Sequence, residues 1–85
     1  MTTPAQRALA HGADFPYDGG GEFWTKIDVP PPPAVDWAHR AARGVLADLT
    51  DRQGVKHELS AVDYDVREEL TDSIAAIIRE AGAAR

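Results

Sequence analysis

The chain contains no cysteine, which removes disulfides and thiolate metal sites as means of stabilising a protein of 85 residues. Large apolar side chains are also scarce, because only 17 residues are Leu, Ile, Val or Phe, whereas 15 are Ala. Burying one large apolar side chain contributes roughly 1.5–3 kcal/mol, while ordering each residue costs about 1.5 kcal/mol. A solitary copy is therefore expected to be marginally stable, so we predict burial against a second copy or a protein partner.

Long hydrophobic runs and excess positive charge are absent as well. No apolar run approaches the roughly 18 residues of a membrane-spanning helix, and no basic, hydrophobic leader opens the sequence. We therefore expect a cytoplasmic protein without membrane association. The 9 Lys and Arg against 14 Asp and Glu give a formal net charge of −5. Such a surface repels phosphate backbones, so direct binding of nucleic acid is not expected.

Catalytic motifs are missing too. Neither serine lies in a nucleophile-elbow pattern, and the triple glycine lacks the lysine of a phosphate-binding loop. The three histidines fall on separate predicted elements without zinc-site spacing: His11, His39 and His57. Three acids around the triple glycine could chelate a hard cation, although an exposed flexible loop is the favoured interpretation: Asp14, Asp18 and Glu22. We thus predict a protein that is not an enzyme and holds no metal or cofactor.

Residues 1–33 are predicted to form an irregular N-terminal arm that includes a short helix. Thr3, Pro4 and Gln6 have the pattern of a capping box with proline in the first turn. Gly12 is a plausible C-terminal stop. These signals predict a helix of about two turns over Pro4–His11.

The rest of this arm has the pattern of extended structure. Glu22–Val29 alternates apolar and polar residues, which predicts a strand, and Asp14–Tyr17 is its expected partner in a small hairpin. Pro30–Pro33 is expected to be a stiff polyproline II spacer that separates this arm from the remainder of the chain.

Residues 34–81 are predicted to form an antiparallel helical hairpin. Helices are expected over Ala34–Leu49 and Asp63–Ala81, with one irregular turn within Val55–Val62. Gly44 is expected to lie opposite the packing face of the first helix and to weaken it. That face is alanine-rich (Ala34, Ala38, Ala41, Ala42, Val45, Leu46, Leu49), and four polar residues are expected to point away from it (Asp36, His39, Arg40, Arg43). The predicted class is therefore mainly α: a single small domain of residues 1–85, with a helical hairpin, a short N-terminal helix and a small extended or β-hairpin element.

The final predicted helix has two opposed faces. Its apolar face comprises Val66, Leu70, Ile74, Ile77, Ile78 and Ala81. Its acidic face comprises Asp65, Glu68, Glu69 and Asp72. The acidic face is the candidate partner-binding surface, either as a docking surface for a basic protein or as a mimic of nucleic-acid phosphates. The favoured interpretation is that these carboxylates complement the helix dipole and otherwise face water.

Trp24 and Trp37 are predicted to lie outside the apolar faces of their elements. Large rings in such positions are either anchors of an interface or lids that close the N-terminal arm over the helices. The thin core favours the lid, and both interpretations stay open.

The second half of the chain also resembles a known group of sequences. The resemblance is carried by Asp51–Leu59, Val62–Leu70 and Ile74–Arg79 and extends over about Ala38–Ala81. These segments are similar to the C-terminal part of small uncharacterised proteobacterial proteins, often found in phage-like regions. The resemblance implies a bacterial or phage source and a non-catalytic role. It also suggests, by analogy, a counter-defence inhibitor such as an anti-CRISPR protein.

Taken together, these observations predict a non-catalytic, acidic protein–protein interaction module, acting as a homo-oligomer or as an accessory subunit of a larger assembly. The alternative function is an anti-CRISPR-like inhibitor whose acidic helix face blocks a nucleic-acid-binding cleft.

Overall fold

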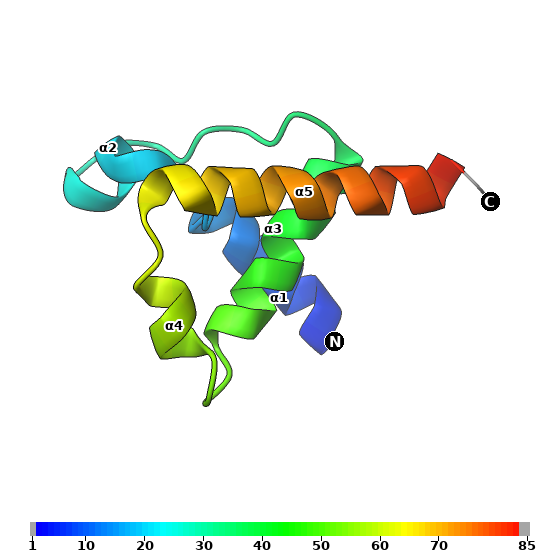
Figure 1. Ribbon diagram of the computed structural model, residues 1–85, viewed down its shortest axis with the longest axis horizontal. Helices are drawn as coiled ribbons and strands as arrows, with labels where there is room; N and C mark the ends of the chain where they lie inside the picture. Colours follow the sequence, from blue (N-terminus) through cyan, green and yellow to red (C-terminus); the bar gives the residue numbers. More distant parts are fainter. Residues whose placement is uncertain (1, 84–85) are drawn as a thin grey trace.

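Helices make up all the regular structure of residues 2–83, the part of the chain described by a computed structural model (Figure 1). Five helices follow one another: α1 (Pro4–Asp14), α2 (Gly20–Thr25), α3 (Trp37–Thr50), α4 (Lys56–Ser60) and α5 (Tyr64–Ala83). The mainly helical class predicted from the sequence is confirmed. The predicted β element is not, since no strand occurs between residues 2 and 83.

The start of α1 follows its sequence signals closely. The Gln6 amide donates to the Thr3 hydroxyl at 3.1 Å, and the Thr3 amide donates to the Gln6 side chain at 2.8 Å, which completes the capping box. The predicted stop at Gly12 is wrong, because the helix continues to Asp14. A Cβ atom at Gly12 would lie 2.5 Å from the carbonyl oxygen of Arg43. This glycine therefore permits close approach of α1 to α3 and does not end the helix.

The strand predicted over Glu22–Val29 is also wrong. Its first half forms the short helix α2, and Asp14–Tyr17, the expected partner, is divided between the end of α1 and a buried turn. An eight-residue alternation is a weak signal, and here tertiary contacts decide the local structure. Phe23 folds back over the turn, where its ring lies 2.9 Å from the position of a Cβ atom at Gly19.

The four prolines lie in an irregular, exposed segment between α2 and α3, which Figure 1 shows running past α5. The segment does not simply separate two parts of the molecule. Arg43 in α3 donates from Nη1 to the carbonyl oxygen of Pro32 at 2.7 Å, so the segment is fastened to the helical core.

Helix α3 is central and contacts both α1 and α5. It begins three residues later than predicted, because the Asp36 carboxylate accepts from the His39 amide at 2.8 Å and caps the helix. The predicted alanine-rich face is buried at Ala38, Ala42 and Leu46. Gly44 is buried as well, contrary to prediction: it lies against Leu9 of α1.

Helix α5 packs across α3 with opposite ends of the two helices together. Asp36 and Trp37, at the start of α3, lie beside Arg79 and Gly82, near the end of α5. Figure 1 shows the two helices crossing obliquely, with α4 leading into the start of α5. No helix within residues 2–83 is both long enough and apolar enough to cross a bilayer.

Candidate functional sites

The inward face of α5 is rotated from the apolar face predicted from the sequence. Thr71 and Ala75 are its buried residues, whereas Ile77 is 67% exposed and Val66 is 45% exposed. At 100° per residue, Val66, Leu70, Ile77 and Ala81 fall on one side of the buried face. We call these four residues the outer apolar strip. Because three of the four (Val66, Ile77 and Ala81) are exposed, this part of the predicted apolar face is open to solvent.

The four predicted partner-binding acids lie together on α5, and we call them the acidic stripe: Asp65, Glu68, Glu69 and Asp72. All four are exposed, and no salt bridge within residues 2–83 involves any of them. The first and last of them are seven positions apart, or roughly 10 Å along the helix axis. The stripe therefore presents unneutralised carboxylates to solvent or to a partner.

Arg79 lies on the same side of α5 as the acidic stripe, but it is engaged elsewhere. Its Nε and Nη2 atoms donate to the two carboxylate oxygens of Asp36, at 2.8 and 3.1 Å. This hydrogen bonding raises the pKa of Arg79, and the charges of Asp36 and Asp72 act in the same direction. The pKa of Asp36 is lowered, first by its bond with Arg79 and then by its bond with the His39 amide.

An open hollow of about 560 Å³ lies on the exposed surface of α5, C-terminal to the acidic stripe and beside Ile77 and Ala81 of the outer apolar strip. Small side chains at Ser73 and Ala76 form it, with Ile77, Glu80 and Ala81 around them. An exposed isoleucine beside a hollow, with a carboxylate at the rim, resembles the apolar centre and polar rim of a protein interface.

The two tryptophans lie near opposite ends of α5 and are not brought together. Trp24 is 39% exposed, and its indole nitrogen donates to the carbonyl oxygen of Pro16 at 3.1 Å. Trp37 is 59% exposed and lies against Gly82. Each ring thus covers part of its own chain and leaves another part open, so the anchor and the lid both stay predictions.

Arg67, the base amid the acids of α5, ties the start of this helix to other elements. Its guanidinium carbon lies 4.8 Å from the ring centre of Tyr17 and 5.0 Å from that of Tyr64. Its Nε donates to the carbonyl oxygen of Val62 at 2.9 Å, and its Nη2 to that of Ser60 at 2.7 Å. Burial raises the pKa of Tyr17, and the nearby Arg67 charge partly offsets that shift. These contacts stabilise the junction of α4 and α5.

A buried polar cluster, consisting of Asp18, His39 and Arg43, was missed by the sequence analysis. One carboxylate oxygen of Asp18 lies 2.7 Å from His39 Nε2, and the other accepts from Arg43 Nε at 2.7 Å. The three side chains are 4–9% exposed. The prediction that His39 and Arg43 point to solvent is therefore wrong, as is that of an exposed loop around Asp18. The weak available signal is the His-x-x-x-Arg spacing, which places two donors on one helix face.

The hydrogen bonds of His39 define what the cluster can do. Its Nδ1 accepts from the Val35 amide at 2.9 Å, so a neutral ring carries its proton on Nε2 and donates it to Asp18. Both ring nitrogens are thus engaged within the chain. The cluster links α3 to the loop before α2 and to the proline segment, which is a structural role.

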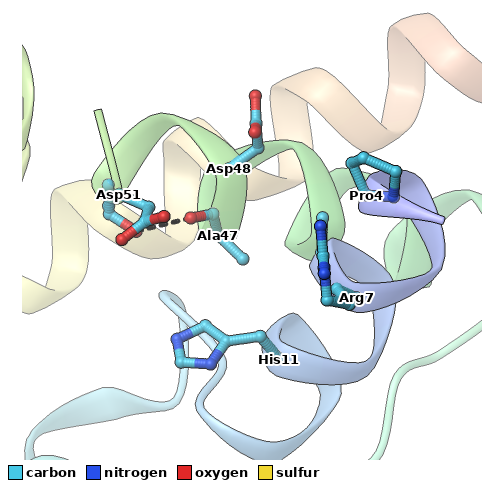
Figure 2. A pocket seen from close by; sticks show the side chains of 8 residues that line it. Pro4, Arg7, His11, Ala47, Asp48 and Asp51 are labelled. Carbon is cyan, nitrogen blue, oxygen red and sulfur yellow. Dashed lines mark hydrogen bonds between the residues drawn. The ribbon is translucent and has the colours of Figure 1, made fainter. Parts of the chain in front are cut away.

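A polar cavity of about 360 Å³ lies between α1 and the end of α3. Figure 2 shows Arg7 and His11 of α1 on one side of it and Asp48 and Asp51 on the other. Asp48 pairs with Arg52 at 3.0 Å, and no salt bridge within residues 2–83 crosses the cavity. The histidines remain apart on α1, α3 and α4, and the described part of the chain contains no cluster of three residues suited to holding a metal ion.

Comparison with known proteins does not assign the chain to a family. No protein-family model, curated protein or solved structure gave a significant match to the chain. The resemblance of Ala38–Ala81 to phage-type proteins therefore stays a prediction.

Proposed function

We propose that this protein is a non-catalytic interaction module or accessory subunit that acts by self-association or by binding a larger protein. The observation that carries this proposal is the imbalance between its buried and exposed apolar side chains. The core contains mostly alanine, and Leu46 is its largest fully buried aliphatic residue. Meanwhile Ile27, Val35 and Ile77 are 89%, 83% and 67% exposed. Covering such surface releases roughly 25 cal/mol per Å² of apolar area, which favours assembly.

Sedimentation velocity over a range of concentrations, combined with a pull-down from the native host, tests this function. We expect a defined oligomer or a recovered complex of fixed stoichiometry. The double variant Ile27→Ser, Val35→Ser should weaken a self-assembly that uses the proline segment. Its melting temperature should match that of the wild type at concentrations where both are monomeric, because both side chains are exposed in a single copy, and fall below it where the wild type assembles. A stable, folded monomer that recovers no partner would contradict the proposal.

A second candidate function is inhibition of a nucleic-acid-guided nuclease, as in anti-CRISPR proteins of phage or prophage origin. The acidic stripe favours it, because four exposed carboxylates without a salt-bridge partner in residues 2–83 could occupy a cleft that binds phosphates. The resemblance of the second half of the chain to phage-type proteins supports the same idea.

Charge reversal separates this candidate from a purely solvated helix face. Replacing all four acids of the stripe by Lys should abolish competition with nucleic acid in a mobility-shift assay of the nuclease complex. The matched control reverses four exposed acids outside α5: Asp14, Glu22, Asp51 and Glu58. Unchanged inhibition by the stripe variant would eliminate the candidate.

A further inference from the structure

The acidic stripe and the outer apolar strip are neighbours on one exposed helix face. At 100° per residue, Glu69 of the stripe and Glu80, one further acid, form the edge of the acidic side of the helix. Val66 and Ile77 of the outer apolar strip lie next to that edge. We infer that this composite face of α5 docks an amphipathic helix of another protein, whose apolar ridge is bordered on one side by Lys and Arg. The inference rests on the proposed interaction function and specifies the chemistry of its partner.

Charge complementarity favours a partner helix with Lys and Arg along one edge over a second copy of this chain. A two-fold pair of α5 helices in antiparallel contact would place the same edge of each face together. Centred between Ile74 and Ala75, that arrangement brings Glu69 of one copy close to Glu80 of the other, without a basic residue on that edge to offset the repulsion. A helix with Lys or Arg along the same edge turns this repulsion into attraction.

The apolar part of the face has the dimensions for such a helix. Val66 and Ile77 are eleven residues apart, or roughly 16 Å, which corresponds to about three helical turns of a partner. The hollow beside Ile77 is lined by the small side chains of Ser73 and Ala76 and can take one large side chain from the partner's ridge. Glu80 lies at the rim of the same hollow, where it can pair with a neighbouring base of that partner.

Fluorescence anisotropy with synthetic peptides tests the inference. The probe is a labelled 18-residue helical peptide with a Leu ridge and Lys along one flank. At roughly 1.5 Å per residue it is about 27 Å long, enough to cover the apolar part of the face. A scrambled peptide of equal composition lacks the ridge. We expect the ridge peptide to bind at least about tenfold more tightly than the scrambled one, since apolar anchors dominate interfaces. Binding should weaken as salt rises.

Variants of the protein locate the peptide. Ile77→Asn should weaken binding about tenfold, as for loss of an interface anchor, and the pair Glu69→Lys, Glu80→Lys should weaken it about fivefold and flatten its salt dependence. Val45→Asn is the matched control, because Val45 is a similarly open apolar residue on α3, at 44% exposure. It should bind the peptide as the wild type does, and all three proteins should melt alike.

Three results would overturn the inference. Equal binding of the ridge and scrambled peptides would mean that charge alone attracts them. Absence of peptide binding would remove this docking face, while sedimentation and pull-down would still decide the proposed interaction function separately. If Ile77→Asn converted an oligomer of the protein into monomers, the occupant of the face would be a second copy.

Discussion

Replacing Asp18 by Asn should destabilise the protein far more than its small change in size suggests. The Asn oxygen can still accept from Arg43 Nε, but its amide group would face the Nε2–H of His39, donor against donor. Moving the imidazole proton to Nδ1 does not help, because Nδ1 already accepts from the Val35 amide. Either arrangement leaves one buried donor without an acceptor.

The size of the effect follows from burial. Arg43 is 3% exposed, and removing one partner of a buried ion pair costs roughly 3–5 kcal/mol. Arg43 keeps its bond to the Pro32 carbonyl and a neutral acceptor at position 18, so we expect the lower end, about 3 kcal/mol. In a domain of this length each kcal/mol lowers the melting temperature by roughly 4–8 °C, so the midpoint should fall by at least about 12 °C.

Circular dichroism during urea and thermal unfolding at neutral pH measures this loss. Asp48→Asn is the matched control, because Asp48 pairs with Arg52 at a site where the two side chains are 49% and 64% exposed. Such surface pairs contribute about 0–1 kcal/mol. If Asp18→Asn were no more destabilising than Asp48→Asn, the structural importance of the buried cluster would be refuted.

Three further predictions concern packing, acid sensitivity and a single hydroxyl. Gly12→Ala should destabilise the fold by roughly 1–3 kcal/mol in urea unfolding, because the added Cβ meets the backbone of Arg43; an unchanged midpoint would show that α1 and α3 separate easily. The Asp36 pKa is lowered in the folded protein, so its stabilising contribution is present above the unfolded pKa of about 3.9 and is lost as the pH falls further. Asp36→Asn and the wild type should therefore converge in stability below about pH 4, and a constant difference from neutral to acid pH would contradict the role of Arg79. Tyr17→Phe removes a 2.6 Å hydrogen bond to a carbonyl of α4 and should cost about 1 kcal/mol in the same assay, whereas wild-type stability would show that water replaces it.

Local signals in the sequence correctly predicted the start of α1 and part of the buried face of α3. The Thr3–Gln6 capping box is present with both of its hydrogen bonds, and the alanine face of α3 is buried where the 3.6-residue period places it. Such features depend on residues within one or two turns of each other. They are therefore available from the chain itself, before any tertiary contact is known.

Interactions between distant residues were invisible for the same reason. Asp18 reaches His39 and Arg43 across 21 and 25 residues, so nothing local marks these polar residues as buried. The sequence predicts a helix stop at Gly12 and a weak point at Gly44, whereas each glycine is needed where another helix approaches closely.

The candidate interaction face was predicted in part. The sequence placed the acids and the apolar residues on different sides of α5, which the helix confirms. It could not show which apolar residues α3 would cover. That depends on the crossing of the two helices, which buries Thr71 and Ala75 and leaves Ile77 outside.

The central position of α3 has a consequence for how the molecule comes apart. Between residues 2 and 83, α1 and α5 make no helix-to-helix contact, and each is stabilised chiefly by α3. Fraying of either outer helix therefore need not loosen the other, provided that α3 keeps its shape. Amide protons of α3 should be the slowest to exchange with deuterium, while those of α1 and α5 should exchange earlier and independently of each other.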